Sequence, residues 1–379
     1  MLITRKIQTN IEKNLFKNKI IVIYGPRQVG KTTLLKMINS NHTNKKSLFL
    51  NCDFSQIREK LFDVNQNDLT NLFANYEIIF IDEAQRVKNI GLTLKTAIDH
   101  FPHKQFIVTG SSSFDLSNEI NEPLTGRKYE FYLYPFSLQE IWSDKNILER
   151  ENLLKHHLTF GLYPDIVNNP NDAQKNLEAL VNGTLYKDVL EYQTVKHSEL
   201  LQKLLQALAF QVGQEVSYNE LSSLLKTNKE TIQRYIHLLE KSFIIFRLTP
   251  YSRNLRTELR KLRKIYFYDI GIRNALINNF SEAKLRNDIG ALWENFLIME
   301  RIKSLQNNTT IPRNYFWRTH QQQEIDYLED VDGKLSTFEF KWNPKKVRKQ
   351  APKAFRDAYF EATFESITPE NYQEFIGLN

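Results

Sequence analysis

The sequence contains very little cysteine and lacks long apolar runs. Cys52 is the only cysteine among 379 residues, which excludes an intrachain disulfide and a metal cluster held by cysteines. No stretch approaches about 18 uninterrupted apolar residues, and residues 1–18 lack the apolar core of a signal peptide. No repeat of solenoid length is present. We therefore expect a cytoplasmic protein with no membrane partner.

Length and net charge indicate several domains and an attraction to polyanions. A chain of 379 residues is long enough for two or three domains, so one functional site occupies only part of it. The formal net charge of +7 favours anionic partners. ATP, nucleic acid and anionic membranes all fit this charge, so charge alone does not choose among them.

Residues 25–33 are typical of a phosphate-binding loop between a strand (20–24) and a helix. Glycines let backbone N–H groups surround a polyphosphate, and the helix directs the positive end of its dipole at the same oxygens. Lys31 then neutralises the β and γ phosphates, and the Thr32 hydroxyl binds Mg²⁺. The alternative is an ordinary strand-to-helix turn with one lysine. We predict ATP and Mg²⁺ as cofactors, with an ATP site formed by Gly25, Pro26, Arg27, Gln28, Val29, Gly30, Lys31, Thr32 and Thr33.

Two acidic residues follow a second strand pattern. Residues 76–81 are predicted to form a buried strand, and Asp82 and Glu83 come directly after it. In a parallel sheet, carboxylates at this position lie beside the phosphate loop. We expect Asp82 to hold Mg²⁺ and Glu83 to polarise the attacking water. The alternative is an exposed acidic pair that begins a turn.

Two further residues are candidates for the hydrolysis step. Ser111 follows the predicted strand 105–109, where a hydroxyl can reach between the γ phosphate and the water. Ser112 fits nearly as well, and simple turn chemistry is the alternative. Arg127 fits the role of an arginine finger on the γ phosphate of a neighbouring subunit, which requires a homo-oligomer such as a ring or dimer. The alternative is an arginine paired at the surface.

Five motifs together resemble one family. They are the segments 25–33, 81–85, 109–112, 126–127 and 134–137. This combination is similar to the prokaryotic AAA-type ATPases, in which an AAA+-like module precedes an uncharacterised C-terminal domain with restriction-endonuclease-like features. The resemblance covers the chain from about residue 4 to its end.

The resemblance implies an α/β fold in several parts. We predict a P-loop ATPase domain with an AAA+/ASCE-like parallel sheet, a helical and winged-helix region, and a C-terminal α/β restriction-endonuclease-like domain of the PD-(D/E)xK type. The predicted boundaries are 1–140 for the ATPase domain, 141–196 for a helical lid or linker, 197–268 for the winged helix and 269–379 for the nuclease-like domain.

The predicted winged helix contains a pattern that fits DNA binding. Residues 217–225 and a helix from residue 229 show helical spacing of apolar positions, and the segments 243–248 and 264–268 are strand-like. In the second helix the apolar positions share one face, which leaves the other to Lys229, Gln233, Arg234 and His237. The alternative is a winged helix used only for protein packing.

The C-terminal third carries a constellation that resembles a restriction-endonuclease active centre. Asp326 and the Glu339-x-Lys341 motif lie on predicted strands, with Glu294 on a predicted helix. In the strand 337–342 the aromatic residues alternate with Glu339 and Lys341, which we expect to point together away from Phe338, Phe340 and Trp342. The resemblance implies that Asp326, Glu339 and Glu294 bind Mg²⁺ and that Lys341 activates water. Charge alternation on a solvated strand is the alternative.

A basic tract follows this constellation. Lys345, Lys346 and Arg348 fit contacts to a phosphate backbone, and a cationic solubilising surface is the alternative.

Three functions are consistent with these sequence features. The leading one is an oligomeric ATPase that binds and remodels or processes DNA. The others are a metal-dependent nuclease regulated by ATP, and a signalling or defence switch that binds a protein partner.

Overall fold

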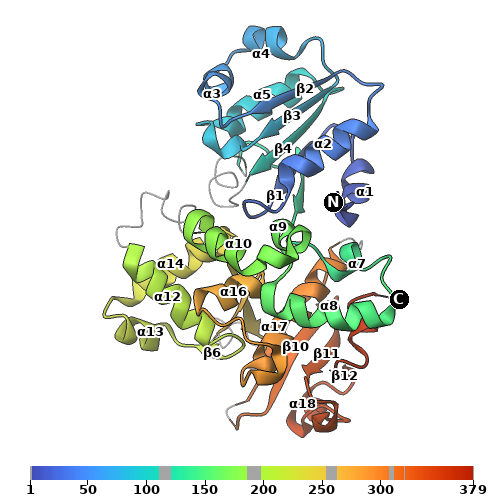
Figure 1. Ribbon diagram of the computed structural model, residues 1–379. Coiled ribbons are helices and arrows are strands. Elements are labelled where there is room, and N and C mark those ends of the chain that lie inside the picture. Colours follow the sequence, from blue (N-terminus) through green and yellow to red (C-terminus); the bar gives the residue numbers. More distant parts are fainter. Residues whose placement is uncertain are drawn as a thin grey trace. The chain divides into compact units, whose positions relative to one another are not determined.

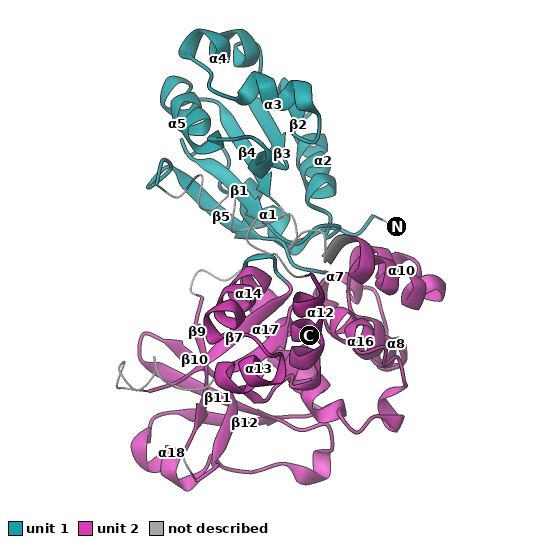
Figure 2. Ribbon diagram, turned by 90° about the vertical axis from the view of Figure 1, so that its left-hand side faces the viewer, with its two compact units in different colours: residues 1–135, 241–243 teal, residues 136–240, 244–379 magenta. Residues whose placement is uncertain are grey.

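The computed structural model describes residues 2–110, 120, 122–185, 198–252, 263–306, 311–319 and 321–378. The chain forms two compact units (Figure 2): unit 1 comprises residues 1–135 and 241–243, and unit 2 comprises residues 136–240 and 244–379. The boundary thus lies after residue 135 rather than 140. The predicted boundaries after 196 and 268 fall inside unit 2. Within the described residues, every helix is too short or too polar to cross a membrane.

Unit 1 is built around a parallel five-stranded sheet with the order β2-β3-β4-β1-β5 (Figure 1). The strands are β1 (Ile20–Tyr24), β2 (Ser47–Asn51), β3 (Ile78–Asp82), β4 (Gln105–Gly110) and β5 (Lys128–Tyr132). The helices are α1 (Lys6–Glu12), α2 (Lys31–Asn41), α3 (Ser55–Leu61), α4 (Gln66–Phe73), the short 3₁₀ helix η1 (Ala84–Arg86) and α5 (Ile90–His100).

The apolar side chains of β1, β3 and β4 hold helices on both faces of this sheet. Alternate residues of a strand point to opposite faces. Ile107 of β4 therefore lies in the cluster that contains Leu34 and Ile38 of α2, whereas Phe106 packs edge-on against Phe73 of α4 at 5.5 Å between ring centroids. The central strands β1, β3 and β4 are buried on both faces, as their continuous apolar sequences require.

Unit 2 contains helices and one mixed sheet. The helices are α7 (Leu138–Ile141), α8 (Ile147–Phe160), α9 (Pro164–Asn168), α10 (Ala173–Ala179), α12 (Ser198–Phe210), α13 (Tyr218–Leu224), α14 (Lys229–Lys241), α16 (Ile270–Leu276), α17 (Ile289–Leu305), α18 (Lys353–Ala358) and α19 (Tyr372–Phe375). The strands are β6 (Glu215–Val216), β7 (Ile245–Pro250), β8 (Arg263–Phe267), β9 (Arg313–Arg318), β10 (Glu324–Val331), β11 (Lys334–Phe340) and β12 (Thr363–Ile367).

One sheet runs through the whole of unit 2. Its order is β12-β11-β10-β9-β7-β8-β6, so strands from the predicted winged helix and from the predicted nuclease-like domain are neighbours. The junction is a short parallel pairing between β7 and β9, in which Thr249 lies opposite Tyr315. Strand edges pair readily with one another, which explains why a boundary after residue 268 does not separate two compact bodies here.

A buried histidine gives unit 2 a predictable response to acid. The His157 side chain of α8 is 4% exposed, and its Nδ1 atom has no hydrogen-bond partner among the described residues. Burial lowers the pKa of His157 to about 3. Between about pH 3 and pH 6.5 the unfolded chain therefore binds a proton that the folded chain does not.

We expect the free energy of unfolding of unit 2 to fall as the pH drops below about 6.5, by up to about 1.4 kcal/mol per pH unit from this one group. Urea unfolding at several pH values, followed by tryptophan fluorescence, measures this slope. His157→Met is expected to flatten the slope between pH 4 and 6, roughly the window in which only the unfolded histidine is charged. Leu148→Met, a change at an exposed position of α8 that involves no titratable group, serves as the control and leaves the slope as it is.

Candidate functional site

The loop after β1 has the backbone geometry of a phosphate cradle. Gly30 adopts a left-handed conformation with φ +98° and caps the start of α2, and Gln28 is left-handed as well, with φ 60°. A Cβ atom at Gly25 would lie 2.2 Å from the Leu133 carbonyl oxygen, so only glycine fits there. The loop therefore turns tightly and directs the amino-terminal end of α2 toward it.

Lys31 is held at the centre of this loop. Its side chain is 4% exposed, and its ammonium group donates hydrogen bonds to the carbonyl oxygens of Gly25 at 2.9 Å and Pro26 at 3.0 Å. The same ammonium lies 3.8 Å from Glu83 Oε1. Two predicted residues from distant parts of the sequence are thus in one charged pair.

Thr32 and Asp82 meet at the carboxyl edge of the sheet. The Thr32 hydroxyl donates a hydrogen bond to Asp82 Oδ2 at 2.6 Å. The other carboxylate oxygen, Oδ1, accepts a bond from the Thr109 hydroxyl at 2.5 Å. A hydroxyl and a carboxylate side by side form the donor set that P-loop proteins use for Mg²⁺. The residues present therefore fit this ion together with a nucleotide.

Glu83 is oriented by its neighbours. It adopts a left-handed conformation with φ 54°, which turns the chain sharply after β3. Its backbone N–H donates to the Thr109 hydroxyl at 3.1 Å, and its Oε2 atom accepts a bond from the Gln85 side chain at 2.6 Å. The carboxylate is thus positioned, with Oε1 toward Lys31.

Three residues of this site were missed from the sequence. Thr109 lies near the end of the buried strand β4, and its hydroxyl at that place was the signal that could have identified it. Gln85 lay inside a recognised motif, but no role was assigned to it. Arg5 gave no signal at all. Its buried guanidinium donates to the Val29 carbonyl at 3.1 Å and to the Tyr134 carbonyl, so it ties the loop to the end of unit 1.

Of the other two residues predicted for the hydrolysis step, the structure describes only Arg127. Ser111 lies outside the described residues, as does Ser112. Arg127 precedes β5, and its carbonyl accepts a bond from the Ile20 N–H at the start of β1. It therefore lies at the edge of the sheet opposite the phosphate loop, about 16 Å away for strands of 5 residues. Its guanidinium pairs with Asp99 at 2.8 Å.

The predicted nuclease residues meet in unit 2, but not in the expected surroundings. The negative charge of Glu294 and the positive charge of Lys341 both act on Asp326, and Lys341 pairs with Glu339 at 2.7 Å. Burial, followed by the charge of Glu294, raises the pKa of Asp326 to about 7. A residue absent from the prediction, Lys264 of β8, lies 3.0 Å from Glu294 and 4.0 Å from Asp326.

The strand predicted at 337–342 is shorter in the structure, and Glu339 on it is not solvated. β11 ends at Phe340, so Lys341 and Trp342 lie beyond it. Glu339 is 3% exposed, because β11 is covered on both faces. On one face Phe338 packs against Phe375 at 4.8 Å, and on the other Leu335 lies in a cluster with Phe355 of α18.

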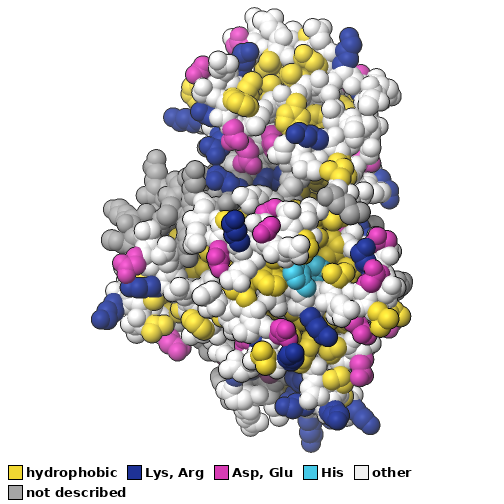
Figure 3. All heavy atoms as spheres, viewed as in Figure 1, with side chains coloured by type: hydrophobic (Ala, Val, Ile, Leu, Met, Phe, Trp, Pro, Cys, Tyr) yellow, Lys and Arg dark blue, Asp and Glu magenta, His cyan; other side chains and the backbone are white. Residues whose placement is uncertain are grey.

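The side chains predicted to bind DNA are exposed. On α14 the apolar residues Ile232, Tyr235, Ile236 and Leu239 are buried, and Lys229, Gln233, Arg234 and His237 are exposed, together with Glu230. Lys345, Lys346 and Arg348 are exposed after β11. Figure 3 shows Lys and Arg side chains gathered at the end of unit 2 where Figure 1 places α18.

The sheet, loop and acidic pair define unit 1 as a P-loop domain of the AAA+-like ATPase class. In agreement, residues 17–142 match the model of a family described as "AAA domain". Residues 151–283 and 289–371 match two further families, each described as a domain of unknown function, DUF8612 and DUF4143.

Several whole proteins are similar to this chain. Uncharacterized protein MJ1544 of Methanocaldococcus jannaschii is 27% identical over 412 aligned residues, which cover 98% of this chain and 89% of that protein. Uncharacterized protein Rv2008c of Mycobacterium tuberculosis is 26% identical over 348 residues, 90% of this chain and 74% of that protein. Among solved structures, the Walker-type ATPase PABY2304 of Pyrococcus abyssi aligns with a TM-score of 0.48 and 17% identity, over 73% of this chain and 96% of that one.

Proposed function

We propose that this protein hydrolyses ATP in unit 1 with the help of Mg²⁺ and that it acts on DNA. The observation that carries the ATPase part is the 2.6 Å bond between Thr32 Oγ1 and Asp82 Oδ2. It places the hydroxyl that follows the phosphate loop and the carboxylate that follows β3 at one point, where a nucleotide-bound ion needs them. Phosphate release by the purified full chain, measured with and without Mg²⁺, tests this part.

Each side chain has a defined task in this proposal. The backbone of residues 25–30 and the start of α2 bind the polyphosphate, and Lys31 neutralises its charge. Thr32 and Asp82 would hold Mg²⁺, which would neutralise negative charge on the polyphosphate. Glu83 orients the attacking water and accepts its proton.

In this proposal Arg127 acts in a homo-oligomer. It lies at the opposite edge of the sheet from the phosphate loop of its own chain, so it reaches a γ phosphate only in a second copy. In that assembly Arg127 would exchange its exposed pair with Asp99 for the phosphate, and such exposed pairs contribute little stability. We also propose that Ser111 lies near the γ phosphate, because Ser111 directly follows β4 in the sequence.

The DNA part rests on two cationic surfaces of unit 2. One is the exposed face of α14, with α13 before it and the antiparallel pair β7 and β8 after it, an order that supports the winged-helix proposal. The other is the basic tract at Lys345, Lys346 and Arg348. A surface pocket of about 320 Å³ borders this tract, and its lining includes Lys349, Arg356, Tyr359 and Phe360. Phe360 is 85% exposed, which suits stacking on a base.

DNA binding is expected to be salt-sensitive and to depend on the basic tract. Lys345, Lys346 and Arg348 are changed together to serine. We expect the slope of log K against log [salt] to become shallower by about 1 for each phosphate contact that is lost. Fluorescence anisotropy with labelled duplex and single-stranded DNA measures this. The control changes three exposed lysines on other elements, Lys175, Lys203 and Lys284, to serine. If neither form of DNA binds at low salt, the DNA part is wrong while the ATPase part stands.

A further inference from the structure

A buried ammonium group lies among carboxylates in the middle of unit 2. Lys264 of β8 has a side chain that is 1% exposed, and its Nζ atom is 3.0 Å from Glu294 Oε1 on α17. It also pairs with Glu324 Oε1 and lies 4.0 Å from Asp326 Oδ1, both on β10. Two of these three carboxylates are residues for which the sequence predicted a metal-binding role.

The oxygens of this cluster already have partners. Glu294 Oε1 accepts a second hydrogen bond, from the Tyr266 hydroxyl at 2.5 Å. Asp326 Oδ2 accepts the backbone N–H of Phe340 at 2.9 Å. Glu324 Oε2 lies 3.4 Å from the guanidinium of Arg318. Each of the three carboxylates therefore already has a partner in the chain besides Lys264.

A divalent cation does not fit this arrangement. Mg²⁺ binds oxygens at about 2.0–2.1 Å and requires open coordination positions on them. The ammonium of Lys264 occupies the space next to Glu294 Oε1 and repels a second cation. Among the described residues, no group of three or more His, Cys, Asp or Glu side chains is arranged to hold a metal ion.

The backbone keeps Lys264 in this position. β8 is paired on both sides, with Leu248 of β7 and Glu215 of β6 opposite Lys264. The ammonium also lies over the ring of Phe316, 5.6 Å from its centroid. Withdrawal of the side chain would leave three carboxylates without this cation in a poorly hydrated site, at a large cost in free energy.

We infer that the ammonium of Lys264 takes the place of the divalent cation in this carboxylate cluster, and that unit 2 is therefore not a metal-dependent nuclease. The cluster instead joins β8 to α17 and β10, and so connects the strands of the predicted winged helix to the C-terminal part of the sheet. This inference does not depend on ATP hydrolysis or on DNA binding.

Titration with Mn²⁺, without nucleotide, tests the inference. The full-length Asp82→Asn variant is the parent, because this change removes the carboxylate of the ATP site. Mn²⁺ binding is measured by calorimetry in the parent, in the parent with Asp326→Asn and in the parent with Lys264→Met. We expect no Asp326-dependent Mn²⁺ site in the parent. In the parent with Lys264→Met we expect a new site, so that the affinity for Mn²⁺ is about 10- to 100-fold greater than that of the parent.

Two outcomes of this titration would overturn the inference. One is Mn²⁺ binding by the parent that Asp326→Asn abolishes. The other is a folded Lys264→Met protein, judged by circular dichroism, that gains no site. If Lys264→Met does not fold, the comparison of the parent with Asp326→Asn still decides. Plasmid cleavage in Mn²⁺ by the wild-type chain that Glu339→Ala removes would also contradict the inference.

Discussion

Glu83→Gln is expected to reduce the rate of ATP hydrolysis by about 10²- to 10⁴-fold while ATP binding is retained, because the amide cannot accept the proton of the attacking water. The substitution keeps the shape of the side chain and the neighbouring Gln85 contact. Phosphate release under single-turnover conditions measures the rate, and equilibrium binding of a fluorescent ATP analogue measures the affinity.

Lys31→Ala is expected to lose both binding and hydrolysis, since its ammonium neutralises the phosphates themselves. In the structure this ammonium lies between two loop carbonyls and Glu83, so the polyphosphate would find its cationic partner already in place. Lys36→Ala, an exposed lysine on the same helix, is the control and leaves both quantities unchanged. If Glu83→Gln hydrolyses ATP at the normal rate, another residue accepts the proton. If Lys31→Ala binds ATP with normal affinity, the loop is not part of the ATP site.

The proximity of Lys31 and Thr32 to Asp82 and Glu83 was largely predictable because these residues follow local rules. A glycine loop between an apolar strand and a helix has few alternatives, and the carboxylates of a parallel strand lie at the same edge as that loop. Gly25 and Gly30 prove to be required by a close approach and by a positive φ, respectively. Thr109 could not be singled out in this way, because its role depends on which strand lies next to β3.

The extent of the unit 2 sheet could not be predicted because strand pairing between distant segments leaves no local pattern. Several helices and strands were predicted within a few residues, including α13, α14 and β8. The pairing of β7 with β9 was not predicted. Lys264 illustrates the consequence: in the sequence it belongs to a basic stretch beside a strand, and only the sheet brings it to carboxylates from two other elements.

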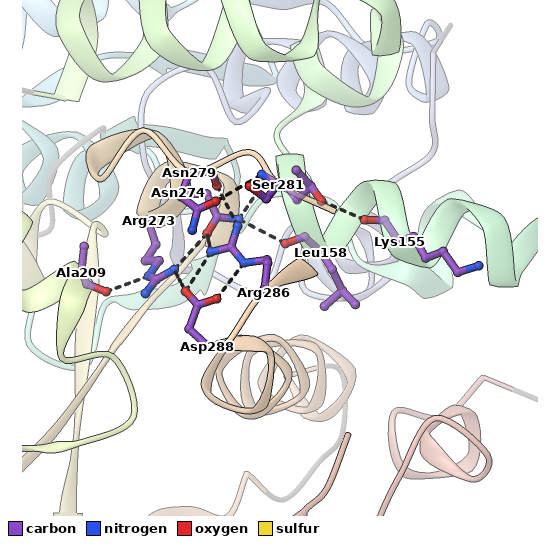
Figure 4. A network of polar contacts seen from close by, with 10 residues as sticks. Lys155, Leu158, Ala209, Arg273, Asn274, Asn279, Ser281, Arg286 and Asp288 are labelled. Carbon is purple, nitrogen blue, oxygen red and sulfur yellow. Dashed lines mark hydrogen bonds and ion pairs between the residues drawn. The ribbon is translucent and has the colours of Figure 1, made fainter. Parts of the chain in front are cut away.

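A second buried ion cluster in unit 2 is formed by two arginines around one aspartate (Figure 4). Arg273 of α16 donates to Asp288 Oδ2 at 2.6 Å, and Arg286 donates to both carboxylate oxygens at 2.8 Å. The guanidinium groups also bind the Asn274 side chain and the Ala209 carbonyl. The side chains of Arg273 and Arg286 are 2% and 1% exposed, and the paired arginines help to lower the pKa of Asp288 to about 2 against the opposing effect of burial.

Asp288→Asn is expected to lower the free energy of unfolding of unit 2 by about 3–5 kcal/mol, because it leaves two buried guanidinium groups facing each other without a counter-charge. All four tryptophans lie in unit 2, so urea unfolding followed by their fluorescence reports on this unit; they are Trp142, Trp293, Trp317 and Trp342. Asp144→Asn, at a position whose side chain is 64% exposed, is the control and is expected to change stability by less than about 0.5 kcal/mol. If Asp288→Asn costs no more than the control, the cluster does not stabilise unit 2, and the two arginines must be accommodated by their bonds to the Asn274 side chain and to the carbonyl oxygens of Ala209 and Asn279.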